Sequence, residues 1–443
     1  MLGCLEIGRS FQYILEIVYL AYSILFGLAL AVVLPLYFLR SRIRRGGPLH
    51  LEQRFGFARP SPARGKPFLW IHAVSVGEVL SLQNLVRRLR AAHPEWEIGF
   101  SVLTETGYAV AREKIRENVD HLFFVPFDMG WPVRRVFARL RPSLLVLAES
   151  EYWPRLLREA QRRRCPVLVV NGRVSSRTFR RMLRFRGPAS FLLRKVTRFL
   201  VQTPGDRERL EKIGVPSAGI EVAGNLKCET RLPVPTPGEL DAYKSGLGIP
   251  PGAKVIVGGS IHLGEEDALL DAFRRARGRR GDVRLVLAPR HPEKFADFER
   301  TKPIGDFVFR RRTKLQSGEN WDILLLDTLG ELARIYAACD AAFIGGSLVP
   351  WGGQNLLEPA FYGKPIVFGP HMENFAALAD AFLEGGGART VRNPEDLAAV
   401  FAFDRPAELE GMGRRSREIL LSLQGATDRT LAAVSSMMGR KLE

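Results

Sequence analysis

Two stretches decide the fold: Phe68-Leu-Trp-Ile-His-Ala-Val74 and Lys254-Val-Ile-Val-Gly-Gly-Ser260. Each is a short, mostly apolar run at the start of a series of alternating apolar runs and helical segments; after the first run, a helix is expected from about Glu78 to Ala92. Continuous apolar runs of this length are typical of strands that are buried on both faces of a parallel sheet. The sequence therefore predicts two α/β halves, each opening with a buried strand.

The alternation continues along the chain. Further strands are expected at 98–103, 122–125, 144–147, 167–170, 199–201, 283–287, 323–326, 341–344 and 365–367. Pro233, Pro235, Pro237 and Gly238 interrupt the pattern, which predicts an interdomain linker at 233–238 between a first domain at 46–232 and a second at 239–443. Alternating βα units predict two Rossmann-like domains that face one cleft, with ligands at the carboxyl ends of the strands.

The charge of the chain is strongly positive and concentrated. Among 443 residues, 65 Lys and Arg against 47 Asp and Glu give a net charge of +18, and residues 160–205 contain twelve basic residues and no acidic one. Such a segment favours an anionic partner: nucleic acid, a phospholipid surface or a phosphorylated substrate. Only four cysteines occur, without a CxxC pair, which excludes a disulfide framework and a cysteine zinc site and indicates a reducing compartment.

The N-terminus carries a hydrophobic segment. Ile17 to Leu39 is an uncharged run of 23 residues, about 34 Å long as a helix, which is enough to cross a bilayer core. The sequence predicts a membrane anchor within residues 1–45, with the helix at about 13–39; a cleaved signal peptide and a surface-lying or buried hydrophobic helix are the alternatives. Arg40, Arg42, Arg44 and Arg45 follow the run and only Arg9 precedes it, so the body is expected on the cytoplasmic side of the inner membrane.

Several familiar chemistries are missing from the sequence. Neither half has a GxGxxG after its first strand, and there is no P-loop, HExxH or GxSxG motif. Glu149-Ser-Glu151 is the one prominent acidic pair, and a single pair offers few oxygen ligands for a hard cation. We expect neither a resident metal nor a cofactor.

In the first half, polar residues follow the strands. Glu78 lies in the first turn of a helix, where the macrodipole favours its charged form, so it is either a general base or an ordinary helix-start residue. Glu149 ends an apolar strand, and a carboxylate in that place needs an Arg or Lys partner from a neighbouring loop. Lys227, in Gly224-Asn-Leu-Lys227, is a candidate site residue or a solvated surface group.

In the second half, three strand ends offer partners for anions and hydroxyl groups. Arg290 ends one strand and suits a phosphate. Asp327-Thr-Leu-Gly-Glu331 leads into a helix N-terminus. Gly345 to Glu358 combines glycines that permit close backbone approach with Asn355 at an expected helix start and a carboxylate for ribose hydroxyls. Tight turns and helix capping explain single features, but not all three motifs in the same half.

The order of these motifs resembles that of the Kdo transferases of lipid A assembly. The resemblance rests on His72-Ala-Val-Ser-Val-Gly-Glu78, Glu149-Ser-Glu-Tyr-Trp-Pro154, Asn171-Gly-Arg173, Gly224-Asn-Leu-Lys227, Pro289-Arg-His-Pro-Glu293, Asp327-Thr-Leu-Gly-Glu331 and Gly345 to Glu358. It implies a membrane-associated, inverting enzyme of GT-B fold that transfers 3-deoxy-D-manno-octulosonic acid (Kdo) from CMP-Kdo to a lipid A precursor. Ile261, the segment Ser101-Val-Leu-Thr-Glu105 and Gly172 depart from the family pattern.

The resemblance also assigns roles to residues. It implies that Glu78 accepts the proton and that Glu149 and Lys227 stabilise the transition state. It implies a CMP-binding set made of Pro289, Arg290, Leu329, Gly330, Glu331, Gln354, Asn355, Leu356, Leu357 and Glu358. No metal is implied, since a single leaving phosphate needs less countercharge than a diphosphate.

The basic segment is assigned to the acceptor and the membrane. Its arginines alternate with Phe179, Met182, Leu183 and Phe185 and are Arg177, Arg180, Arg181, Arg184 and Arg186. With an anchored body, they are expected to contact lipid phosphates and an anionic membrane surface rather than nucleic acid. A solvated charged face is the bland alternative. For the whole chain, the alternatives are another nucleotide-sugar transferase of GT-B fold, or a membrane-tethered anion-binding protein without catalysis.

Overall fold

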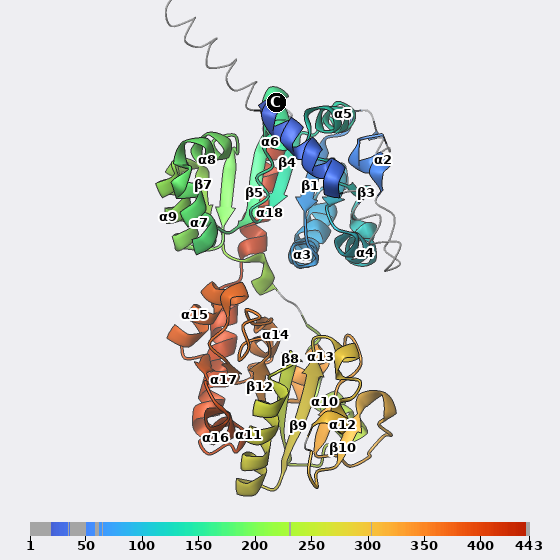
Figure 1. The fold of residues 1–443 in the computed structure, drawn as a ribbon, viewed down its shortest axis with the longest axis vertical. Helices are drawn as coiled ribbons and strands as arrows, with labels where there is room; N and C mark the ends of the chain where they lie inside the picture. The colour runs from blue at the N-terminus through green and yellow to red at the C-terminus, as the bar shows by residue number, and fades with distance from the viewer. Residues whose placement is uncertain are drawn as a thin grey trace, which may run out of the picture. The chain divides into compact units, whose positions relative to one another are not determined.

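The computed structural model describes residues 19–33, 35, 50–57, 62–63, 65–229, 232–302 and 304–439. The chain forms two compact units (Figure 1), the first made of Met1–Glu229 with Gln424–Glu443 and the second of Thr230–Leu423. Each unit is an α/β structure around its own sheet. The two units are described separately below.

The sheet of the first unit contains seven parallel strands within the described residues, in the order β3-β2-β1-β4-β5-β6-β7. The strands are β1 (Phe68–Ala73), β2 (Glu97–Val102), β3 (His121–Phe124), β4 (Leu144–Ala148), β5 (Val167–Gly172), β6 (Arg198–Val201) and β7 (Ile220–Val222). All six residues of β1 are buried. Alternate side chains of β1 enter opposite faces of the sheet, so both faces need helices over them.

Two groups of helices cover these faces. Side chains from α3 (Val76–Ala92), α4 (Glu105–Lys114) and α18 (Ala426–Gly439) pack on one face. Side chains from α5 (Gly130–Leu140), α6 (Pro154–Arg162), α8 (Arg186–Leu193) and α9 (Pro204–Ile213) pack on the other. The short α2 (Leu51–Arg54) lies near β3, and α7 (Ser176–Arg184) has no buried residue.

The second unit repeats this architecture. Its described strands are parallel, in the order β10-β11-β9-β8-β12-β13-β14: β8 (Lys254–Ile261), β9 (Val283–Pro289), β10 (Phe309–Arg311), β11 (Ile323–Leu325), β12 (Ala341–Ile344), β13 (Ile366–Phe368) and β14 (Ala388–Thr390). The helices are α10 (Pro237–Gly246), α11 (Glu266–Arg279), α12 (Phe298–Thr301), α13 (Leu332–Ala338), α14 (Leu357–Phe361), α15 (Ala376–Glu384), α16 (Pro394–Phe401) and α17 (Pro406–Ser422). The two faces carry separate hydrophobic cores, one against α11 and α16 and one against α13.

The structure confirms every strand that the sequence predicts and adds three. The additional strands β7, β10 and β14 have three residues each and lie at sheet edges or next to them. The linker differs from the prediction at its end: Pro237 and Gly238 begin α10, because Thr236 and Glu239 form a capping box there and proline suits the first helical position.

The last helix also differs from the prediction, which placed everything after residue 239 in the second half. Ala426, Ala433, Val434 and Met438 of α18 join the core of the first unit. Glu229 Oε1 accepts the Gly425 N–H (2.7 Å), and Arg88 pairs with Asp428 (2.5 Å). The apolar face of α18 is therefore buried against α3.

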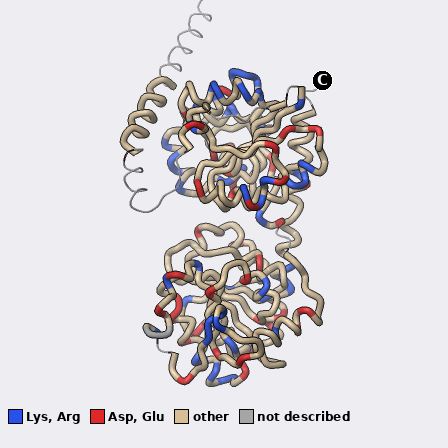
Figure 2. Tube along the Cα trace, turned by 90° about the vertical axis from the view of Figure 1, so that its right-hand side faces the viewer, with Lys and Arg blue, Asp and Glu red and all other residues tan. Residues whose placement is uncertain are grey.

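Residues 19–33 are helical and form the described part of the expected anchor. One side of this helix contacts the first unit: Tyr22 donates to Asp128 (3.0 Å) and Arg155 donates to Ser23 Oγ (2.6 Å). The helix contains no charged residue and is tan in Figure 2. In the part of the chain that the structure describes, no helix is long and apolar enough to cross a membrane. Ile17, residues 36–39 and the four arginines at 40–45 lie outside the described residues.

Candidate active site

Both sheets reverse their strand order at one point. In the first unit, β1 and β4 are neighbours and the next strands run outward from them; in the second unit, β8 and β12 hold the same places. In open parallel sheets, ligands bind at the carboxyl ends of the two strands that flank such a switch point. Glu78 follows β1 and Glu149 follows β4, so the first switch point brings together residues that are 71 positions apart.

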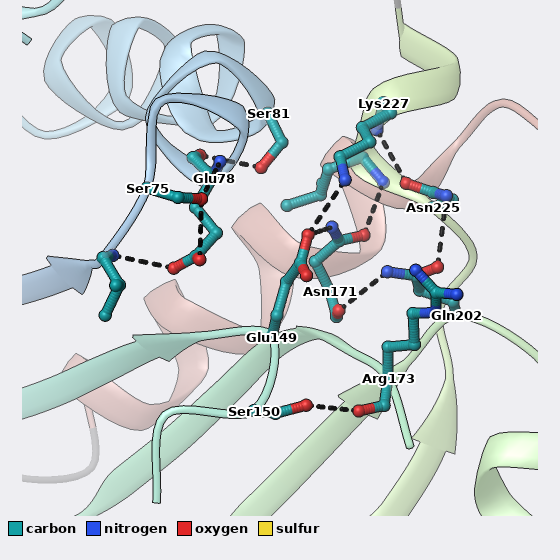
Figure 3. A network of polar contacts seen from close by, with 12 residues as sticks. Ser75, Glu78, Ser81, Glu149, Ser150, Asn171, Arg173, Gln202, Asn225 and Lys227 are labelled. Carbon is teal, nitrogen blue, oxygen red and sulfur yellow. Dashed lines mark hydrogen bonds and ion pairs between the residues drawn. The ribbon is translucent and has the colours of Figure 1, made fainter. Parts of the chain in front are cut away.

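Glu78 is held at the start of α3 by local hydrogen bonds (Figure 3). Ser75 is the N-cap, and its hydroxyl oxygen accepts the Glu78 N–H (3.4 Å). The Glu78 carboxylate accepts the Val74 N–H on Oε2 (2.8 Å) and the Ser75 hydroxyl on Oε1 (2.9 Å). The prediction that Glu78 lies in the first turn of a helix is confirmed, and these hydrogen bonds fix its carboxylate at the end of β1.

The environment of Glu78 raises the pKa of its carboxyl group to about 7. Burial is the largest cause, and the negative charges of Glu151 and Glu149 act in the same direction; the hydrogen bond from Val74 N–H opposes them. A carboxyl group with a pKa near 7 can be ionised at neutral pH and still accept a proton effectively. The arrangement therefore has the properties of a general base.

Glu149 has the cationic partner that the sequence predicts. Lys227 Nζ donates to Glu149 Oε1 (3.0 Å), and Asn171 Nδ2 lies 3.5 Å from the same oxygen. Glu149 and Asn171 both have positive φ, 49° and 54°, at the ends of β4 and β5. Non-glycine residues seldom adopt this conformation, which turns both side chains at the strand ends.

Further hydrogen bonds hold Asn171 and Lys227 in place (Figure 3). Asn171 Oδ1 accepts the Leu226 N–H (3.0 Å), and Asn171 O accepts from Gln202 Nε2 (3.0 Å). Asn225 Oδ1 accepts the Lys227 N–H (2.9 Å). Lys227 thus sits in an ordered polar network rather than on a solvated surface.

Glu151 also belongs to this site. From the sequence it was considered only as a possible metal ligand. Its Oε2 accepts the indole N–H of Trp153 (2.8 Å), and burial followed by the charge of Glu149 raises its pKa against the effect of that bond. Among the described residues, no group of three or more His, Cys, Asp or Glu could hold a metal ion. The signal for Glu151 was its spacing, two residues after Glu149 at the same strand end.

In the second unit, the CMP-binding candidates follow β9, β11 and β12. Arg290 is exposed, and its backbone N–H donates to the carbonyl oxygen of Ile261 (2.9 Å), the last residue of β8. Leu329 is 85% exposed in the loop after β11. Glu331 stands at the N-cap position of the short helix α13 without a side-chain capping bond; its carboxylate pairs with Arg312 instead (3.0 Å).

The loop from Gly345 to Glu358 is organised by a residue that the sequence did not single out. Glu265, fully buried, accepts N–H groups from Gly346 (2.7 Å), Ser347 (2.9 Å) and Leu348 (2.9 Å), and the His262 N–H (2.9 Å). The loops after β8 and β12 are therefore tied together by one carboxylate. Nothing in the sequence around a Glu at the start of a helix indicates hydrogen-bond partners more than 80 residues away.

The end of this loop enters α14. Asn355 Oδ1 accepts the Leu357 N–H (3.1 Å), and Asn355 Nδ2 donates to Glu358 Oε1 (3.2 Å). Burial raises the pKa of Glu358 against this hydrogen bond. Gln354 and Asn355 are partly exposed, whereas Leu356, Leu357 and Pro289 are buried, so the latter three can offer a ligand only backbone groups or apolar contact.

The five arginines of the basic segment are all exposed on or next to α7. Phe179 and Met182 pack against the core of the first unit, while Leu183 and Phe185 are 39% and 60% exposed. The segment therefore presents apolar and cationic side chains together on its surface.

Comparisons with known proteins identify relatives of this chain. Residues 49–230 match the family model described as 3-deoxy-D-manno-octulosonic-acid transferase (kdotransferase). The 3-deoxy-D-manno-octulosonic acid transferase of Bordetella pertussis is 32% identical over 434 residues, which cover 93% of this chain and 97% of that protein. A bifunctional glycosyltransferase/methyltransferase of Fusobacterium nucleatum is 30% identical; the match covers 85% of this chain but just over half, 57%, of that protein.

A solved structure supports the fold. HepE from Anabaena in complex with UDP matches 84% of this chain and 100% of its own, with a TM-score of 0.58 and 13% identity. At this identity the likeness concerns the fold alone. Two parallel-sheet α/β domains of the kind found in GT-B glycosyltransferases are thereby confirmed.

Proposed function

The chain belongs to the family of 3-deoxy-D-manno-octulosonic acid transferases, and we propose that it transfers Kdo from CMP-Kdo to a lipid A precursor, with inversion, in lipopolysaccharide biosynthesis. The observation that carries this proposal is the 32% identity with the Bordetella pertussis enzyme over nearly the whole of both proteins. The chemistry at the two switch points fits it.

In the first unit, Glu78 is the general base. Its carboxylate takes the proton of the acceptor hydroxyl while that oxygen bonds to the anomeric carbon of Kdo and the bond from that carbon to the CMP phosphate oxygen breaks. Support comes from the raised pKa of about 7 and from the hydrogen bonds that fix Glu78. General bases of this type contribute roughly 10²- to 10⁴-fold to turnover.

Glu149 and Lys227 stabilise the charges that develop during transfer. Their 3.0 Å ion pair keeps a cation at the switch point and pairs the Glu149 carboxylate. In the second unit, Arg290 binds the phosphate of CMP, Glu358 accepts hydrogen bonds from ribose hydroxyls, and Leu329, Gly330 and Glu331 line the nucleotide.

We place the enzyme at the cytoplasmic face of the inner membrane, anchored by its N-terminal segment. The described helix exposes six large apolar side chains: Leu20, Ile24, Leu25, Leu28, Val32 and Val33. Phe57 and Trp131, both about half exposed, lie under the guanidinium of Arg135 at 4.6 and 5.2 Å. Apolar and aromatic surface bordered by arginine suits a lipid interface, and α7 adds charges for lipid phosphates.

The decisive experiment is to incubate the purified protein with radiolabelled CMP-Kdo and a tetraacylated lipid A precursor, and to identify the product by mass spectrometry. We expect a lipid product that is heavier by whole Kdo residues. Turnover of another nucleotide sugar but not CMP-Kdo would replace this proposal with a different glycosyltransferase. Binding of both substrates without any product would indicate an anion-binding protein.

A further inference from the structure

The second switch point contains an exposed aromatic platform that the assignments above do not use. Trp351 is 58% exposed, and its indole ring stacks on the imidazole of His262 with ring centroids 5.0 Å apart and an angle of 18°. His262 follows β8 and Trp351 follows β12, the two strands that flank the switch point. The platform therefore stands where a parallel sheet of this type binds its ligand.

The platform is held in place before any ligand binds. Asn374 Nδ2 donates to Trp351 O (3.0 Å), and the Asn374 N–H donates to Gly352 O (2.8 Å). Gly353 has φ of +73°, and a Cβ atom there would lie 2.3 Å from Met372 Sδ, so the chain requires glycine beside the tryptophan. Together with Glu265, which fixes the start of the same loop, these contacts position the indole ring.

The surroundings of the platform are cationic. Arg290, His291 and Lys294, all exposed, lie close enough to His262 to lower its pKa, although burial is the larger cause. Gln354 Nε2 lies 3.1 Å from His262 Nε2; with the amide donating, the neutral imidazole carries its proton on Nδ1. The nearby carboxylate of Glu293 pairs with His291 (3.3 Å). Arg290 and Lys294 therefore supply positive charge beside the aromatic rings.

We propose that Trp351, supported by His262, is the platform on which the sugar-acid half of the donor stacks, while Lys294 balances its carboxylate and Arg290 remains with the phosphate. This inference rests on the proposed function, because it names the sugar as an acidic one. A CMP ester of a sugar acid has two anionic groups, one phosphate and one carboxylate, whereas CMP alone has only its phosphate. A pyrimidine base is neutral, so a platform for the base would need no cations around it.

The geometry also suits a sugar. The C–H hydrogens on one side of a pyranose ring carry partial positive charge and pack on the negative face of an indole ring. A few polar groups beside an apolar surface fix the orientation of such a ligand, and Gln354 lies within reach of the His262 ring for that purpose. The exposed loop at Leu329 and Gly330 remains for the nucleoside.

The test compares two ligands in the absence of acceptor, so it does not depend on turnover. We expect Trp351→Ala to weaken CMP-Kdo binding by roughly 10-fold in calorimetry and to leave the affinity for CMP within about 2-fold. Trp351→Phe should recover most of the loss, because a phenyl ring keeps a stacking face. Leu263→Ala, which removes an exposed apolar side chain next to His262, is the matched control and should change neither affinity.

Lys294→Gln tests the charge. It should weaken CMP-Kdo more than CMP, because it removes a cation without changing the platform. Equal losses for CMP and CMP-Kdo in Trp351→Ala would assign the platform to the base and overturn the inference, as would unchanged affinity for CMP-Kdo. If the wild-type protein forms no Kdo–lipid product, the proposed function is contradicted instead. The binding comparison contains no acceptor, so it does not depend on that result.

Discussion

The switch points of the two units have the same topology but opposite chemistry. At the first, three carboxylates lie close together, from Glu78, Glu149 and Glu151, and Lys227 pairs with one of them. At the second, Arg290 and Lys294 lie near His262, whose ring stacks on the exposed indole of Trp351. The pKa of Glu78 is raised and that of His262 is lowered. In both cases burial is the largest cause, and neighbouring groups of like charge act in the same direction.

The difference fits the roles proposed for the two sites. A general base gains from removal of water, because burial brings its pKa near the working pH. An anion site must stay open to its ligand, and arginine keeps its charge whether it is exposed or partly buried. The same parallel-sheet framework therefore supports a buried acidic site and an open basic one, and the loops alone decide which.

The largest effect is expected from Glu78→Gln, which removes the base but keeps an oxygen acceptor for Val74 N–H. We expect turnover to fall by roughly 100-fold or more while the affinity for CMP stays unchanged, since the proposed CMP site lies in the second unit. Steady-state kinetics and calorimetry on the same protein would check both.

A matched control separates catalysis from helix capping. Glu239 occupies the same position in the capping box of α10 as Glu78 does at the start of α3, but it is exposed. Glu239→Gln should change the stability little and leave turnover unchanged. If Glu78→Gln behaved the same way, Glu78 would be a capping residue and nothing more.

The next effect concerns the open basic site. Arg290→Ala and Glu358→Ala should each weaken CMP binding by roughly 10- to 100-fold, the scale of one charge-assisted hydrogen bond. Arg275→Ala is the control, since Arg275 pairs with Asp271 on the surface of α11. Unchanged CMP affinity in both site variants would show that the nucleotide site has been misassigned.

Most of the fold could be predicted from sequence because its strands are buried on both faces. Residues 68–73 are all buried, so an unbroken apolar run marks them plainly. The short strands β10 (Phe-Arg-Arg) and β14 (Ala-Arg-Thr) contain arginine, so no apolar run marks them. The apolar face of α18 could join any core, and sequence gives no sign that Ala433 and Val434 pack on the first unit.

Part of the site could be predicted from the sequence, where burying a charged group without a partner would be energetically unfavourable. A carboxylate at the end of an apolar strand requires a cation, and Lys227 meets that requirement for Glu149. Glu265 binds backbone N–H groups 81 to 83 residues away, and backbone donors have no sequence signature. Trp351 was likewise hidden, because its partner His262 comes from another strand end.

A smaller effect is expected from the basic segment, which belongs to the first unit and should act on the acceptor. Changing Arg180, Arg181 and Arg184 to Glu should raise the acceptor KM by roughly 10-fold at low salt and weaken binding to anionic liposomes, without altering CMP affinity. Reversing Arg87, Arg112 and Lys114, which are exposed on α3 and α4 across the sheet, is the control. Equal behaviour of the two triple variants would make the segment a solvated charged face.

The smallest expected effect is a shift in the pH dependence of kcat/KM. It tests whether the carboxylates at the first switch point influence one another's pKa. For a base with a pKa of about 7, kcat/KM should rise with pH through a midpoint near 7, since only the ionised form of Glu78 accepts a proton. Glu151→Gln removes a negative charge that raises this pKa, so the midpoint should move to lower pH, while the amide oxygen still accepts from Trp153. Glu149 still contributes after this change, which keeps the movement modest, and Lys227 remains paired with it. Glu113→Gln on the surface of α4 should leave the midpoint in place. A midpoint that Glu151→Gln leaves unchanged, or moves upward, would mean that the charge of Glu151 does not raise the pKa of Glu78.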